Sequence, residues 1–420
     1  MLSCLIGFLG PMHSQSDRSL SLRACQELAI AQVPINSKKG LLEEAAQIKT
    51  DGLNAQRLPT IYWKAKGTVQ SETVSLPFVL PGQDEAFSVP RINGQTTLDA
   101  QYLIYDGGMI DATQRLEYAL LAKDVQAIQV ALHPVKEQVQ KVFFGILLLE
   151  AQTKVLDNAL ADLAQREQNL TAAAEHGVIL PINIKKLQVE AVKLNKKRVE
   201  LNGERNSLLV LLEDLTGQAF PKEVVLQIPE VDLEEFNRAS QRPELSLLDR
   251  QQQILLEQGK LVEVQNKPQV SAFLQAGLGY ANPLNFFDTN LSPFAIAGIN
   301  FQWKIWDGKQ VQKRKDWLSI QSQLVENQRE NFMYQQSLLD RQYQERAEKI
   351  SRILEQDRQH IALQNDIIQQ VNAQLSQGTI TATEYITELN QHTNAQLELA
   401  LHELQLQEIQ IQYLTQKGIW

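Results

Sequence analysis

Four segments of the chain alternate between apolar and polar residues at every second position. In residues 61–70 the odd positions are apolar or small, and the even positions are polar or amphipathic. A period of two is typical of a β-strand with one apolar face and one polar face. We therefore predict strands at about residues 59–75, 96–105, 268–281 and 293–306, two in each half of the chain. Their apolar positions are Ile61, Trp63, Ala65, Gly67 and Val69 in the first strand, Leu98, Ala100, Tyr102 and Ile104 in the second, Val270, Ala272, Leu274, Ala276, Leu278 and Tyr280 in the third, and Ala295, Ala297, Ile299, Phe301, Trp303 and Ile305 in the fourth.

The two strand pairs belong to an internal duplication with constant spacing. An Asp-Gly dipeptide follows each pair, and a further glycine lies about 70 residues beyond each dipeptide. Both of these landmarks are 201 residues before their counterparts in the second copy, whereas Pro59, just before the first strand, is 209 residues before its counterpart Pro268. The segments between these landmarks therefore have the same length, which indicates two structural repeats. The matching landmarks are Asp106 and Gly107 with Asp307 and Gly308, and Gly177 with Gly378.

The segments between these landmarks are predicted to be very long helices. Both are almost free of proline and glycine, and apolar residues recur in them at the three- and four-residue spacing of a coiled coil. A helix of about 70 residues is about 100 Å long. A glycine should end each helix, and return helices should follow at 181–216 and 382–417, the first opened by Pro181. Shorter helices, at 22–56 and 243–266, should lead into the first strand of each repeat.

This pattern gives a mainly α-helical fold with membrane-type β-strands and four regions. Residues 1–17 are a signal-like segment, because an apolar run follows Met1. Within that run Cys4 is a less favoured candidate for lipid attachment. The first repeat covers 18–216, with its long helix at 107–176, and an irregular region rich in proline covers 217–242. The second repeat covers 243–420, with its long helix at 308–377.

The strands are candidates for crossing a membrane. No run of 18 apolar residues occurs, so no transmembrane helix is predicted. The charged residues Lys64, Lys66, Asp99 and Lys304 require water on the polar face, and no segment of the chain is a good cover for the apolar face. A water-soluble sheet with one buried face is the alternative. Four strands cannot close a barrel, whereas three copies of the chain would supply twelve.

The composition gives no support for catalysis or for nucleic-acid binding. The net charge is −9 and no basic stripe is present to neutralise phosphates. The six histidines are scattered without metal-ligand spacing, and no phosphate-binding or nucleophile motif occurs. Glu388 and His392, four residues apart, are read as a surface pair. We therefore expect no enzyme activity, no cofactor and no metal.

Several of these features together resemble the TolC-like outer-membrane efflux proteins. The resemblance lies in the order and spacing of the Asp-Gly junctions, the Gly378-Thr379-Ile380-Thr381 turn and the Arg242-Pro243-Glu244 segment that opens the second repeat. It covers about residues 19–417. It implies a homotrimer in the outer membrane of a Gram-negative bacterium, with a twelve-stranded β-barrel and an α-helical periplasmic tunnel. It also implies docking to a periplasmic adaptor and an inner-membrane transporter, for efflux or type I secretion.

In members of this family, acidic residues on the return helix narrow the entrance of the tunnel. The resemblance places Glu384 at the first such position and Thr387 at the second, with Glu388 one residue further. The corresponding residues of the first repeat are Asn183 and Lys186. A solvated helix face is an equally good interpretation of Glu384 and Glu388. The rival function for the whole chain is a structural or adaptor-type periplasmic coiled-coil protein without a channel.

Overall fold

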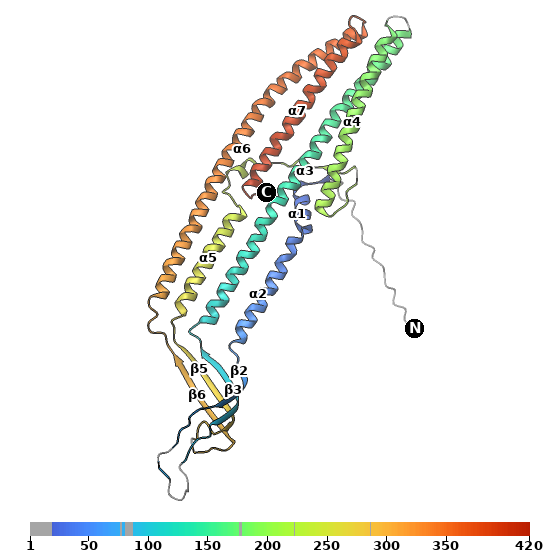
Figure 1. The fold of residues 1–420 in the computed structure, drawn as a ribbon. Helices are drawn as coiled ribbons and strands as arrows, with labels where there is room; N and C mark the ends of the chain where they lie inside the picture. The colour runs from blue at the N-terminus through green and yellow to red at the C-terminus, as the bar shows by residue number, and fades with distance from the viewer. Residues whose placement is uncertain (1–18, 76–77, 80–86, 176–178, 222, 286) are drawn as a thin grey trace, which may run out of the picture. The chain divides into compact units, whose positions relative to one another are not determined.

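The structure of the chain, a computed structural model, describes residues 19–75, 78–79, 87–175, 179–221, 223–285 and 287–420 (Figure 1). The signal-like segment 1–17 and Gly177 lie outside the described residues. The chain divides into two compact units, each built from both halves of the sequence. Unit 1 comprises 1–37, 128–245 and 331–420, and unit 2 comprises 38–127 and 246–330.

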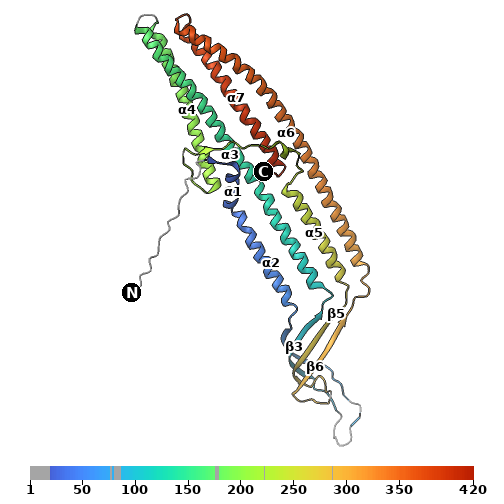
Figure 2. The same cartoon turned by 180° about the vertical axis from the view of Figure 1, so that it is seen from behind.

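Unit 2 contains a four-stranded antiparallel sheet and the helices that lead into and out of it (Figures 1 and 2). The order of strands is β2-β3-β5-β6, so the last strand of the first repeat pairs with the first strand of the second. Helix α2 precedes β2. The bounds are Lys38–Ala55 for α2, Thr60–Val69 for β2, Ile92–Tyr105 for β3, Gln269–Tyr280 for β5 and Ser292–Gln302 for β6.

The ends of three strands differ from the sequence prediction, because a strand ends where its partner ends. Strand β2 stops at Val69, which pairs with Ile92 at the start of β3, and not at residue 75. Strand β3 begins at residue 92 and not at 96, because residues 92–95 also pair with β2, opposite residues 66–69. Strand β6 ends at Gln302, opposite Gln269 at the start of β5, so it stops short of residue 306.

Among the described residues of unit 1, the strands form one short parallel pair, β1 with β4, and the other regular elements are helices. It contains two helical hairpins, α3 with α4 and α6 with α7, which lie side by side in both views (Figures 1 and 2). Helices α3 and α6 begin in unit 2 and end in unit 1, whereas α5 begins in unit 1 and ends in unit 2. The bounds are Ser19–Leu20 for β1, Leu22–Gln32 for α1, Pro34–Ser37 for the 3₁₀ turn η1, Met109–Glu175 for α3, Pro181–Thr216 for α4, Val225–Leu226 for β4, Leu233–Asn237 for η2, Pro243–Val264 for α5, Gln310–Ser376 for α6 and Ala382–Gln416 for α7.

The long helices reproduce the constant spacing of the sequence. Helices α3 and α6 each have 67 residues, and their first residues, Met109 and Gln310, are 201 apart. The helix predicted at 22–56 is, in contrast, divided into α1, η1 and α2. Pro34 lacks a backbone N–H and forces the preceding residue out of the helical conformation, and Val33 has an extended ψ of 126°.

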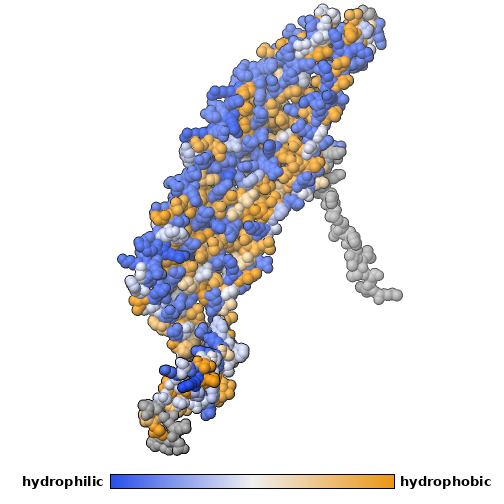
Figure 3. Space-filling model, in the orientation of Figure 1, coloured by the Kyte–Doolittle hydropathy of each residue, from blue (hydrophilic) through white to orange (hydrophobic). Residues whose placement is uncertain are grey.

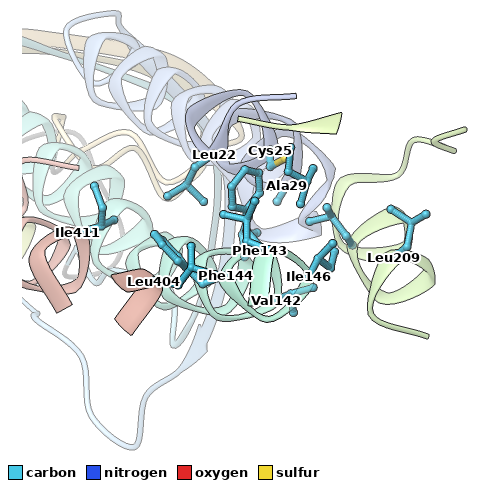
Figure 4. Close-up of a cluster of buried hydrophobic side chains, with 14 of the residues drawn as sticks. Leu22, Cys25, Ala29, Val142, Phe143, Phe144, Ile146, Leu209, Leu404 and Ile411 are labelled. Atoms are coloured by element: carbon cyan, nitrogen blue, oxygen red, sulfur yellow. The ribbon is translucent and has the colours of Figure 1, made fainter. Parts of the chain in front are cut away.

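The main core of unit 1 gathers apolar side chains from α1, α3, α4 and α7 (Figure 4). Phe143 and Ile146 on α3 are fully buried there, against Leu22 and Cys25 on α1. Burial of one such side chain contributes about 1.5–3 kcal/mol. Burial also raises the pKa of the Cys25 thiol to about 12.

A second cluster joins the two hairpins, with buried residues from all four helices. Its members include Leu163 and Leu170 on α3 and Ile368 and Leu375 on α6, two pairs seven residues apart, which is the repeat of a coiled coil. Every helix within the described residues is too short or too polar to cross a lipid bilayer.

Candidate functional site

The sheet of unit 2 has one apolar face and one polar face, and its register agrees with the predicted alternation. Residues that face each other across antiparallel strands project from the same side of the sheet. The register pairs Trp63 with Leu98, Ala100 with Leu274, and Ala272 with Ile299. One face therefore collects the predicted apolar positions that lie in the regular ladders of the four strands, whereas Ile104 lies at a register shift and Trp303 and Ile305 lie beyond the end of β6.

The apolar face is exposed to an unusual degree. Trp63 is 75% exposed, Leu98 57% and Ile299 72%, and apolar surface is visible over the strands in Figure 3. Several large apolar side chains exposed on one face of a sheet favour a site of contact with protein or lipid. The two outer strands are also incompletely paired: within the described sheet β2 pairs only with β3, and β6 only with β5. Each leaves a row of backbone N–H and C=O groups available to another strand.

The polar face has a charged pair at its centre. Lys64 Nζ lies 2.7 Å from Asp99 Oδ2, and Gln275 Nε2 donates to Asp99 Oδ1 at 2.9 Å. Asp99 is 7% exposed and the neighbouring Thr97 3%. The carboxylate thus has a cation and a donor amide, which satisfies a charge that would be costly to bury alone.

The Asp-Gly junctions start the two long helices in the same way. The Asp106 carboxylate accepts hydrogen bonds from Gly108 N at 2.8 Å and Ile110 N at 2.6 Å. These are N–H groups that a helix start leaves without partners, and an aspartate side chain is suited to accept them. Gly107 has a φ of 73°, and a Cβ there would lie 2.8 Å from Lys267 Cβ, so both the backbone and the space require glycine.

The second junction repeats this capping with an added side chain. The Asp307 carboxylate accepts from Lys309 N at 2.8 Å and Val311 N at 2.9 Å, and from Asn266 Nδ2 at 2.8 Å. The hydrogen bond from Val311 N, followed by that from Asn266, lowers the pKa of Asp307 below its usual value. Gly308 has a φ of 66°.

The second hairpin turn is closed by backbone and side-chain hydrogen bonds. Gly378 has a φ of 72°, and Thr379 N donates to Gln374 O at 3.0 Å. Helix α7 then begins with a capping box. Glu384 N donates to Thr381 Oγ1 at 3.3 Å, and Thr381 N donates to Glu384 Oε2 at 2.7 Å. The hydrogen bond from Thr381 N lowers the pKa of the Glu384 carboxyl.

The remaining tip residues lie within the first two turns of α4 and α7. Lys186 on α4 donates from Nζ to Thr383 Oγ1 on α7 at 2.7 Å, so the structure brings the two return helices together at their starts. Lys186 and Thr387 are exposed, and Asn183 and Glu388 are half-buried. Glu388 and His392 do not form the surface pair read from the sequence: His392 Nε2 lies 2.7 Å from Asn365 Oδ1 on α6.

Two buried polar clusters were not anticipated from the sequence. Tyr385, the residue after Glu384, is fully buried and donates from its hydroxyl to Asp162 Oδ2 on α3 at 2.7 Å, and Arg166 lies 3.4 Å from the same carboxylate. The only sequence signal was the position of Tyr385 four residues before Leu389 on an apolar stripe. The second cluster joins His133 Nε2 to Arg242 Nη1 at 2.5 Å. Burial lowers the pKa of His133 to about 4.

Comparison with known proteins finds similarity at the level of structure. No family model and no curated protein matches the chain in sequence. The outer-membrane protein VceC of Vibrio cholerae has 13% identity and a TM-score of 0.62, over 94% of this chain and 96% of that one. The transmembrane channel protein CusC has 12% identity and a TM-score of 0.63, over 94% and 91%. The MtrE outer-membrane channel of Neisseria gonorrhoeae, in its open state, has 12% identity and a TM-score of 0.61, over 94% and 88%. The chain therefore has the fold of the TolC-like outer-membrane channels.

Proposed function

We propose that the protein is a passive exit duct in the outer membrane of a Gram-negative bacterium. The observation that carries this proposal is the exposed apolar face of the sheet in unit 2, which holds side chains such as Trp63 and Ile299. Exposure of these apolar side chains to water is unfavourable, whereas contact with the hydrocarbon of a lipid bilayer is favourable. Strands β2, β5 and β6 have 10, 12 and 11 residues, close to the 9–11 residues that a tilted strand needs to cross a bilayer.

A bilayer requires a closed sheet, and the two outer strands supply the means of closure. An unpaired strand edge in hydrocarbon costs several kcal/mol for each unsatisfied backbone group. Pairing of β6 in one protomer with β2 in the next would satisfy both edges. Three protomers would then form a ring of twelve strands, closed by three-fold symmetry.

The fold also supports a role in export with two further partners. The structurally similar proteins are described as outer-membrane proteins or channels. On this likeness the helical unit 1 would form a periplasmic tunnel, and its tip would dock onto an adaptor and an inner-membrane transporter. The assembly would serve as a tripartite efflux pump or a type I secretion system. A passive duct catalyses no reaction, so the proposed function is a non-enzymatic one.

The test of this proposal is membrane fractionation followed by mass measurement and recording in planar bilayers. We expect the full-length protein in the outer-membrane fraction, a trimer in detergent and discrete ion conductance. A water-soluble monomer without conductance would refute the duct and favour the rival structural or adaptor-type coiled-coil protein, for which an exposed apolar sheet has no purpose.

We further propose that the tip residues form the entrance of the duct: Gly177, Asn183, Lys186, Gly378, Thr379, Glu384, Thr387 and Glu388. The capping box gives Glu384 a structural role as well, so replacement by alanine would alter both the helix start and the charge. Glu384→Gln is the sharper variant, because glutamine retains the capping box and removes only the charge.

If Glu384 lines the entrance, Glu384→Gln should raise the conductance or change its dependence on the cation, and Glu384→Ala should do the same. Thr381→Ala is the control, because it removes the cap without changing the charge. A single-channel record that changes in Glu384→Ala and Thr381→Ala but not in Glu384→Gln would assign Glu384 to helix capping alone.

A further inference from the structure

The polar face of the sheet has an excess of positive charge. The residues on this face follow from the register, which pairs Lys64 with Thr97, Lys66 with Gln95, and Asp99 with Gln275. Among the described strand residues of this face, Lys64, Lys66 and Asp99 are the charged ones. Two cations and one anion leave one positive charge on the face of each protomer.

The excess charge belongs to Lys66. Lys64 is neutralised locally, because its Nζ lies 2.7 Å from the Asp99 carboxylate. Lys66 forms no ion pair with any residue in the described part of the chain. It is exposed, and it lies two positions further along β2 toward the loops.

Lys66 lines a cavity at the loop end of this face. The cavity has a volume of about 420 Å³. Thr68 and Asn93, which face each other on β2 and β3, contribute a hydroxyl and an amide, and Gln95 contributes a second amide. Hydroxyl and amide groups can donate hydrogen bonds to an anion. No acidic residue is among the described residues that line the cavity, although apolar loop residues such as Val89 and Leu284 form part of its wall.

We propose that Lys66 makes the loop end of the barrel lumen attract anions, so that this part of the duct favours permeating anions over cations. The inference rests on the proposed function, because a trimer would place three copies of Lys66 around one lumen. Charges that line a narrow aqueous passage concentrate counter-ions and exclude ions of like charge. Substrates that carry a carboxylate or phosphate would be attracted electrostatically to the loop end, where they leave the barrel.

The experiment is the reversal potential of the full-length trimer in planar bilayers under a gradient of KCl. Lys66→Gln should lower the ratio of chloride to potassium permeability by about two- to threefold, and Lys66→Glu should lower it further. The shift should grow as the ionic strength falls, because screening weakens. The double variant Lys64→Gln/Asp99→Asn is the matched control: it removes one charge of each sign from the same face and should leave the ratio unchanged.

The outcomes separate the two proposals. A wild-type protein that forms neither trimer nor channel would overturn the duct, and this inference with it. A conducting wild-type channel whose permeability ratio is the same in Lys66→Gln and Lys66→Glu would overturn the inference alone. So would a control variant that shifts the ratio as much as Lys66→Gln, since the effect would then not depend on the unpaired charge.

Discussion

Adjacent residues on strand β6 allow a direct test of which face of the sheet meets lipid. Ile299 lies opposite Ala272 on the apolar face and is 72% exposed. Asn300 lies opposite Ser271 on the polar face and is also exposed. Replacing each in turn by arginine introduces the same side chain at neighbouring positions of one strand. If the protein is the proposed duct, Ile299→Arg would place a guanidinium in lipid, and Asn300→Arg would place it in a water-filled lumen.

The size of the effect follows from the depth of Ile299. Arginine on the lipid face costs about 2–4 kcal/mol at the middle of the bilayer and about 0–1 kcal/mol near its surface. Ile299 lies between the centre of β6 and its end at Gln302. We therefore expect about 1–3 kcal/mol per protomer, or about 3–9 kcal/mol for a trimer. Asn300→Arg exchanges one hydrated polar group for another and should cost little.

The assay is the fraction of protein recovered as a folded trimer in the outer membrane, together with insertion of purified protein into lipid vesicles. Ile299→Arg should lower both strongly, while the helical circular dichroism in detergent stays at the wild-type level. Asn300→Arg should insert normally and shift ion selectivity toward anions.

Equal insertion of the two variants would refute the assignment of the apolar face to lipid. Failure of Asn300→Arg with normal insertion of Ile299→Arg would mean that the faces are reversed.

Two further predictions concern unit 1. Tyr385→Phe removes the hydrogen bond from the buried Tyr385 hydroxyl to Asp162 and should destabilise the folded protein by about 1–3 kcal/mol per protomer. The loss should appear as a lower thermal unfolding temperature. Tyr334→Phe, at a tyrosine that is 60% exposed, is the control and should leave the unfolding temperature unchanged. The pKa of His133 is lowered from 6.5 to about 4 in the folded protein. Between these pH values the unfolded chain binds more protons than the folded protein does. The free energy of unfolding should therefore fall as the pH is lowered from 6.5 to about 4. His133→Gln should lose this part of the pH dependence, and an identical slope in both proteins would refute the role of His133.

The features that could be predicted from the sequence are those that depend on near neighbours along the chain. Alternation at every second residue defined the two faces of the sheet, because successive side chains of a strand project to opposite sides. The 201-residue spacing predicted two long helices of equal length, and the structure gives 67 residues to each. Asp106 and Asp307 cap helices through residues two and four positions away, so their role is also local.

Features that depend on residues far apart in the chain became visible only in the folded structure. The strand ends were mispredicted because they are fixed by the length of the neighbouring strand, as Val69 and Gln302 show. Tyr385 and Asp162 are 223 residues apart, and Lys186 and Thr383 are 197 apart, so no local pattern could join them. The difference between Lys64 and Lys66 is of the same kind. Both are lysines on the polar face of β2, and pairing with β3 brings a carboxylate to Lys64, whereas Lys66 has no ion pair within the part of the chain that the structure describes.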